Sequence, residues 1–144
     1  MRVEETFVVA RHPDVVFEYV TNPEKLSSWQ TAKRSVEQLT EGRPGLGSRF
    51  RERTKPPLTK EFEQVTEFTE FDRPRRLHVH IVEGPHPVDG TWTFEPQGEG
   101  TLVHFVAEGE LSGPIKLLEP VASRVFARQF AGYHQNLRRA LERE

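Results

Sequence analysis

Residues 121–144 have the spacing of one long amphipathic helix, and this feature most constrains the fold. At about 100° per residue, the apolar side chains fall on one stripe, which consists of Ala122, Phe126, Phe130, Tyr133, Leu137 and Leu141. Arginine and glutamine side chains occupy the opposite side. At about 1.5 Å per residue such a helix is more than about 30 Å long. It therefore needs a broad apolar surface, and the preceding chain offers strands to form one.

A strand and two short helices are predicted at the start of the chain. Residues 2–10 alternate between two faces, one of which carries Val3, Glu5, Phe7 and Val9. Pro13 is placed to begin a helix of about two turns. Asn22 is placed to cap a second short helix with Pro23 at its first position. Two such helices in succession can close one end of a sheet.

Six further strands are predicted at roughly 34–40, 47–55, 60–70, 75–83, 87–96 and 100–111. Short segments rich in glycine and proline separate them, which predicts an antiparallel meander. Pro120 cannot lie inside a continuous helix, so we expect a short turn over 115–119 and then the main helix, with Pro120 at or near its first position. The order β-α-α-β6-α predicts an α+β fold that forms a single domain over residues 1–144.

The composition limits the classes of function. Hydrophobic residues make up 35% and charged residues 29% of the chain, as in ordinary globular proteins, and the net charge is −2. This balance predicts no attraction to nucleic acid, and no apolar run is long enough to span a membrane. Without a signal-peptide pattern, we expect a cytoplasmic protein. The chain has no cysteine, which excludes disulfides, a thiolate nucleophile and cysteine-based metal sites.

Alternation along the strands predicts which side chains face inward. In 47–55, three arginines alternate with Phe50 and Glu52, and burying the arginines would cost far more than exposing them. Phe50 and Glu52 are therefore expected inside. In segments 60–70 and 87–96, the side chains expected to face inward are Phe62, Gln64, Thr66, Phe68, Val88, Trp92 and Phe94.

Glu52 and Tyr133 are the candidate catalytic residues. A buried Glu52 would have a raised pKa, which suits general acid–base chemistry or the binding of a ligand hydroxyl. The alternative is a carboxylate paired with arginine or exposed at the sheet rim. The hydroxyl of Tyr133 could reach a cavity, or Tyr133 could be a core residue with a satisfied hydroxyl.

Other candidates would bind a ligand without reacting with it. Gln64, Thr66 and Gln129 could orient its polar end, or satisfy one another or a buried water. Trp92, Phe50, Phe126 and Phe130 could form an aromatic wall, or simply pack in the core. Trp29 could close the cavity mouth, or attach the second short helix to the sheet.

Three histidines raise the question of a metal site. His78 and His80 lie two residues apart on one predicted strand, and His104 lies on a later strand. Apolar residues alternate with them along the strands and are expected on the inner face. We therefore expect these histidines to face solvent and expect no metal site. Motifs for nucleotide, serine-hydrolase or zinc-protease chemistry are absent from the sequence, and we expect no cofactor.

Several spaced segments resemble one known family. They are residues 9–17 (VARHPDVVF), 22–29 (NPEKLSSW), 45–47 (GLG), 70–77 (EFDRPRRL), 100–103 (GTLV) and 137–141 (LRRAL). With the order of elements, they resemble the helix-grip fold of the START-like or SRPBCC superfamily, in its polyketide cyclase/dehydrase-type branch. The superfamily includes the birch-pollen allergen. The resemblance implies a curved sheet around the last helix, with a ligand cavity between them.

Three functions remain open at this point. The first is the binding of a small hydrophobic molecule, resembling a lipid, a polyketide or an aromatic compound, with orientation from Glu52, Gln64 or Tyr133. The second is a polyketide cyclase, aromatase or dehydratase, a lyase or isomerase in which Glu52 and Tyr133 move protons. The third is an interaction module of the chaperone-cofactor type. A cavity of several hundred Å³ would favour the first two, and the oligomeric state, including a homodimer, is left open.

Overall fold

The computed structural model describes residues 1–57, 60–111 and 113–143. Its elements, in chain order, are β1 (Arg2–Val9), α1 (Pro13–Thr21), α2 (Pro23–Trp29), β2 (Lys33–Gln38), β3 (Arg49–Thr54), β4 (Phe62–Asp72), β5 (Arg76–Glu83), β6 (Val88–Gln97), β7 (Gly100–Gly109), the 3₁₀ helix η1 (Gly113–Leu118) and α3 (Glu119–Arg143). The predicted order of elements is confirmed. The last predicted position of the main helix, residue 144, lies outside the described residues.

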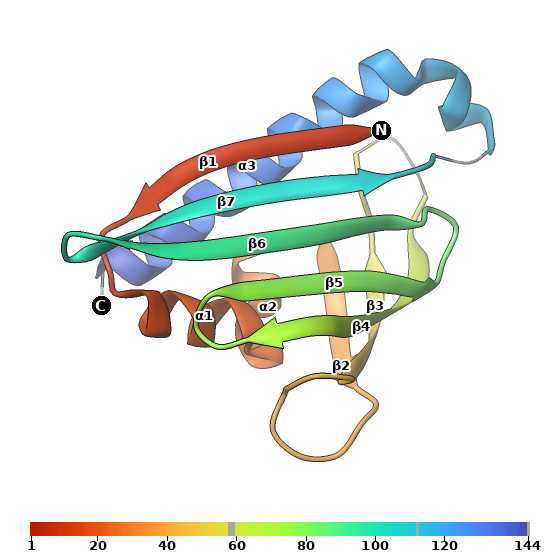
Figure 1. Cartoon of the computed structure of the whole chain (residues 1–144). Helices are drawn as coiled ribbons and strands as arrows, with labels where there is room; N and C mark the ends of the chain where they lie inside the picture. The colour runs from red at the N-terminus through yellow and green to blue at the C-terminus, as the bar shows by residue number, and fades with distance from the viewer. Residues whose placement is uncertain (58–59, 112, 144) are drawn as a thin grey trace.

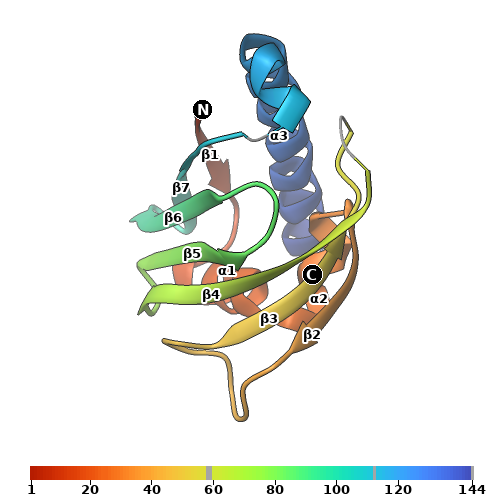
Figure 2. The same ribbon diagram turned by 90° about the vertical axis from the view of Figure 1, so that its right-hand side faces the viewer.

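The strands form one curved antiparallel sheet in the order β1-β7-β6-β5-β4-β3-β2 (Figure 1). All neighbours pair antiparallel, and β1 returns to the end of the meander beside β7. The sheet bends around α3, as Figure 2 shows. The expected helix-grip architecture is therefore confirmed.

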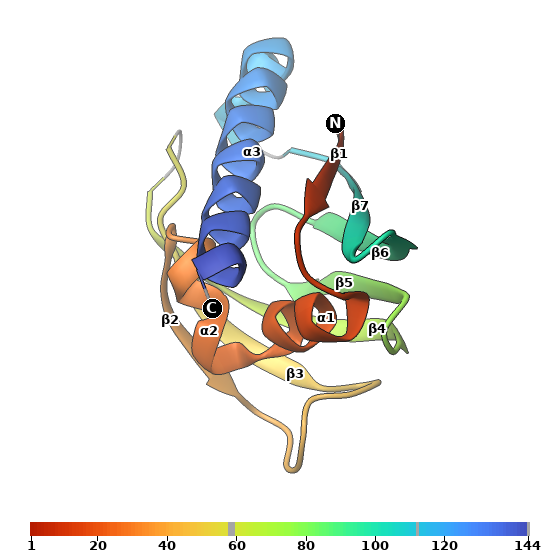
Figure 3. The ribbon, with the colours of Figure 1, turned by 90° about the vertical axis from the view of Figure 1, so that its left-hand side faces the viewer.

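Local sequence signals explain where the helices begin. Pro13 occupies the first position of α1, and the Asn22 side chain accepts a 3.0 Å hydrogen bond from the backbone N–H of Glu24 to cap α2. The predicted turn over 115–119 is η1, and Pro120 lies in the first turn of α3, where a proline costs no helical hydrogen bond. Helices α1 and α2 lie beside the C-terminal part of α3 and close that end of the sheet (Figure 3).

The concave face of the sheet and one side of α3 form the core. The α3 stripe is buried at Ala122, Tyr133, Leu137 and Leu141 and half-buried at Phe126 and Phe130. No described helix combines the length and the apolar character that crossing a membrane requires.

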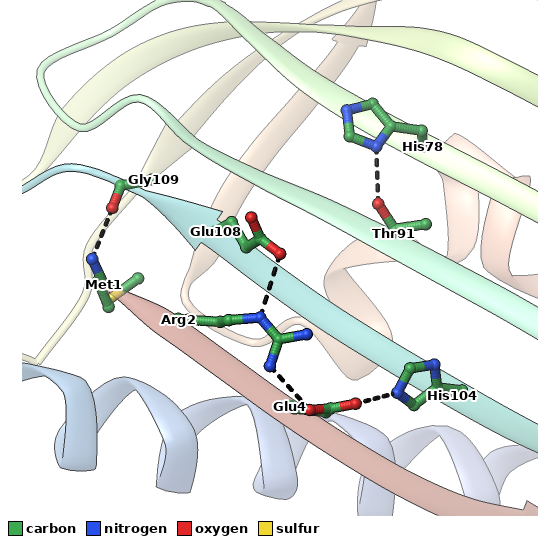
Figure 4. Close-up of polar contacts among 8 residues, drawn as sticks. All are labelled: Met1, Arg2, Glu4, His78, Thr91, His104, Glu108 and Gly109. Carbon is green, nitrogen blue, oxygen red and sulfur yellow. Dashed lines mark hydrogen bonds and ion pairs between the residues drawn. The ribbon is translucent and has the colours of Figure 1, made fainter.

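Charged side chains cover the convex face, as the alternation argument predicted. Arg49 pairs with Glu67 at 2.7 Å, and Arg51 and Arg53 pair with other glutamates. Figure 4 shows a second network on the same face. There Arg2 donates to Glu4 at 2.8 Å and His104 lies 2.5 Å from the same carboxylate. These two hydrogen bonds, from His104 first and Arg2 second, lower the pKa of Glu4.

Candidate functional site

A divided cavity lies between the concave sheet face, α2 and α3. It has two adjoining spaces of about 110 Å³ each. The inner lobe, toward α1 and α2, is lined by residues that include Trp29, Phe50, Glu52, Thr66, Phe68 and Trp92. The outer lobe, toward the start of α3, is lined by residues that include Thr54, Phe62, His86, Leu111, Phe126 and Tyr133. Six residues line both lobes and form what we call the junction: Gln30, Lys33, Gln64, Ile81, Val88 and Phe130.

All ten predicted site residues line this cavity, but they do not share one compartment. Five lie in the inner lobe: Trp29, Phe50, Glu52, Thr66 and Trp92. Gln64 and Phe130 lie at the junction, whereas Phe126, Gln129 and Tyr133 line the outer lobe. Trp29 is 1% exposed and packs edge to face on Trp92. Each lobe is also smaller than the several hundred Å³ considered from the sequence.

Glu52 is the most buried charged group of the cavity. Its side chain is 2% exposed, because β3 turns it to the concave face between β2 and β4. Oε1 accepts hydrogen bonds from the Lys33 ammonium and, at 2.8 Å, from the Gln64 amide. Oε2 accepts from the Thr66 hydroxyl at 3.3 Å. The carboxylate is thus compensated by a half-buried cation and two polar neighbours.

The ion-pair partner of Glu52 corrects the two alternatives drawn from the sequence. Neither an arginine nor solvent compensates the carboxylate. The partner is Lys33, at the first position of β2, whose side chain is 12% exposed. Nineteen residues separate the two in the chain, and only the pairing of β2 with β3 brings them together.

Tyr133 combines features of both interpretations considered for it. Burial raises the pKa of its hydroxyl; a hydrogen bond with the backbone of Ala32 lowers it, and the charge of Glu52 raises it further. The net effect is a raised pKa, so the hydroxyl keeps its proton at neutral pH. The contact with Ala32 fits a satisfied core tyrosine, although Tyr133 also lines the outer lobe. A role in proton transfer stays a prediction.

Buried polar atoms without partners gather around the cavity. In the described part of the chain, the buried side-chain nitrogen and oxygen atoms that lack a hydrogen bond are Trp29 Nε1, Thr54 Oγ1 and His86 Nδ1. All three residues line a lobe. Burial lowers the pKa of His86, which keeps its imidazole neutral at neutral pH. Buried polar groups without a partner are uncommon in folded proteins, and these three lie beside the cavity.

Sequence reasoning missed Gln30. This residue is 6% exposed and lines both lobes. Its backbone caps the end of α2, but its side-chain amide has no hydrogen bond to any described residue. Gln30 follows a helix and belongs to no alternating strand, so no periodic signal in the sequence assigned its side chain to the interior.

Sequence reasoning also missed His134, which is 1% exposed on α3. Trp92 Nε1 donates to His134 Nε2 at 3.1 Å, which requires the ring proton to be on Nδ1. Nδ1 then donates to Glu5 at 2.5 Å. The ring also stacks on Phe7 with centroids 4.5 Å apart. Glu5 within the inward-facing set of the first strand was the signal that a buried polar partner must exist.

The histidines that suggested a metal site lie on the convex face. His80 and His104 have side chains 48% and 42% exposed, whereas His78 is partly covered. His78 forms a 2.7 Å hydrogen bond with Thr91 (Figure 4) and, like His80, contacts Asp89. Within residues 1–57, 60–111 and 113–143, no three histidine, cysteine or acidic side chains form a group that could hold a metal ion.

Comparisons with known proteins agree with this architecture. The family model described as "Polyketide cyclase / dehydrase and lipid transport" matches residues 1–142. A solved structure from Thermus thermophilus is similar with a TM-score of 0.84 and 23% identity, and the match covers 98% of this chain and 97% of that one. A START superfamily protein from Mycobacterium smegmatis gives a TM-score of 0.84 at 16% identity, with 99% and 97% covered. No curated protein matches the chain.

Proposed function

The chain belongs to the polyketide cyclase/dehydrase and lipid transport family, and from this premise we propose that it binds a small hydrophobic molecule in the cavity between sheet and α3. The supporting observation is the divided cavity, whose walls are mainly aromatic and aliphatic side chains around a few convergent polar groups. This combination is typical of small-molecule sites. Burial of apolar ligand surface would supply the affinity, at roughly 25 cal/mol per Å².

The positions of the acid–base candidates favour binding over catalysis by this pair. Glu52 lines the inner lobe and is held by the Lys33 ammonium, whereas Tyr133 lines the outer lobe. Two groups that exchange protons with one substrate must both lie within hydrogen-bond reach of it. A cyclase or dehydratase that uses Glu52 and Tyr133 together would need a substrate that spans the junction.

Filling the inner lobe should weaken binding of an apolar probe. Val79 lines this lobe from β5, and the next residue, His80, faces the convex side. Val79→Phe should weaken binding of 3-methylbutylbenzene by about tenfold or more, because the added ring occupies the ligand's space. Binding can be followed by intrinsic fluorescence, since the two tryptophans of the chain, Trp29 and Trp92, both line the lobe.

The matched control is Thr69→Phe, which adds a phenyl ring at an exposed position of the neighbouring strand β4 that lines neither lobe. It should leave affinity for the probe unchanged. If wild-type protein does not bind the probe, or if both variants bind it as well as wild type does, the proposed function is wrong.

A further inference from the structure

We propose that the cavity selects an uncharged molecule that places an apolar ring in the inner lobe and a carbonyl or hydroxyl oxygen at the junction. This inference rests on the proposed function and specifies the class of ligand. Three features of the cavity support it: the polar groups at the junction, the pairing of charges inside the cavity, and the size and lining of the inner lobe.

Unused hydrogen-bond donors meet at the junction. Gln30 as a residue is 6% exposed and lines both lobes, and its side-chain amide has no hydrogen-bond partner among the described residues. The Lys33 ammonium has three N–H donors, and its one hydrogen bond to a described residue goes to Glu52. In the adjoining inner lobe the indole N–H of Trp29 also lacks a partner in the described part of the chain. This excess of donors matches a ligand that presents an oxygen acceptor.

The charges of Lys33 and Glu52 cancel each other inside the cavity. Lys33 and Glu52 form a buried pair, and the imidazole of His86 is neutral at neutral pH. Asp89 also borders the inner lobe, but its carboxylate is bound by His78 and His80. A charged ligand group would add an uncompensated ion to a largely apolar space, which costs far more than a neutral dipole.

The inner lobe has the size and walls for one ring. Its volume of about 110 Å³ is of the order of the roughly 150 Å³ cavity that accommodates benzene in an engineered protein. Aromatic side chains surround it: the Phe50 and Phe68 rings lie 4.9 Å apart, and Trp29 meets Trp92 edge to face at 6.2 Å. A ring of similar size can make the same edge and face contacts with them.

Four probes of nearly equal shape test the inference at pH 7.5. They are 4-phenylbutan-2-one, 3-phenylpropanoate, protonated 4-phenylbutan-2-amine and 3-methylbutylbenzene, which differ mainly in the group at the end of the same phenylalkyl chain. The ketone should bind about tenfold or more tightly than each of the others, because it alone offers an uncharged oxygen acceptor to the donors at the junction. Tryptophan fluorescence measures all four affinities on the intact protein.

Gln30→Leu removes the amide and nearly preserves its volume. It should reduce the preference for the ketone over the hydrocarbon at least about fivefold, with affinity for the hydrocarbon unchanged or higher. Gln135→Leu, an exposed substitution on α3, should leave the preference intact. The ratio is measured within each variant, so a change in overall stability does not imitate the effect.

Each other outcome overturns the inference in a distinguishable way. Equal affinity for ketone and hydrocarbon would mean that water occupies the hydrogen-bond donors at the junction. The proposed function would then stand without this selectivity. Tightest binding of the carboxylate would mean that Lys33 binds a negatively charged ligand group, and tightest binding of the amine would mean that Glu52 binds a positively charged one. Binding of none of the four, with the hydrocarbon failing as well, would remove the proposed function together with the inference.

Discussion

Replacing Lys33 by methionine is expected to lower the free energy of unfolding by about 3–5 kcal/mol, the range found when one partner of a buried ion pair is removed. The Glu52 carboxylate would remain 2% exposed, with only the Gln64 amide and the Thr66 hydroxyl to compensate it. Urea unfolding followed by circular dichroism measures the change.

Two controls separate this effect from the loss of the lysine side chain as such. The double variant Lys33→Met/Glu52→Met removes both charges and should recover most of the lost stability, because two apolar side chains can replace a buried pair with little penalty. Arg51→Met removes an exposed partner on the convex face and should cost less than about 1 kcal/mol. A single Lys33→Met variant as stable as Arg51→Met would contradict the buried pair.

Replacing His134 by leucine should cost about 1–3 kcal/mol of unfolding free energy. The substitution leaves the Trp92 indole N–H without its partner inside the core, which accounts for this cost, whereas the half-buried Glu5 carboxylate can be hydrated when it loses its own partner. Because Trp92 also lines the inner lobe, its fluorescence spectrum should change as well.

Glutamine at the same position provides a partial rescue. Its Oε1 can accept from Trp92 and its Nε2 can donate to Glu5, so His134→Gln should be clearly more stable than His134→Leu. His104→Leu, on the exposed convex face, should change stability by less than about 1 kcal/mol. If all three variants unfold at the same urea concentration, the buried network has no energetic role.

Much of the fold could be predicted because the spacing of apolar residues and the free-energy cost of burying charged residues assign the same side chains to the interior. The apolar stripe on α3 required an apolar surface to pack against. The alternation of apolar and polar residues in each predicted strand indicated that a sheet would form that surface. The three arginines of β3 could not be buried, which assigned Phe50 and Glu52 to the interior. Pro120 located the start of α3, because proline is tolerated only in a first turn.

Most of what defines the site depends on contacts between distant residues. Lys33 meets Glu52 only through the pairing of β2 with β3, and His134 meets Glu5 across most of the chain. Gln30 lies outside any periodic element. Alternation shows which face a side chain occupies but not which partner it finds there, so the inward direction of Glu52 was predictable and its ion pair with Lys33 was not.

Native mass spectrometry of freshly purified protein, beside the Val79→Phe variant, tests the central claim most directly. The wild-type protein is predicted to carry an uncharged small molecule that is released when the chain unfolds, and Val79→Phe is predicted to carry none. A wild-type spectrum with the mass of the chain alone, identical in kind to that of Val79→Phe and unchanged after incubation with a lipid extract of cells, would contradict a captured ligand between sheet and helix.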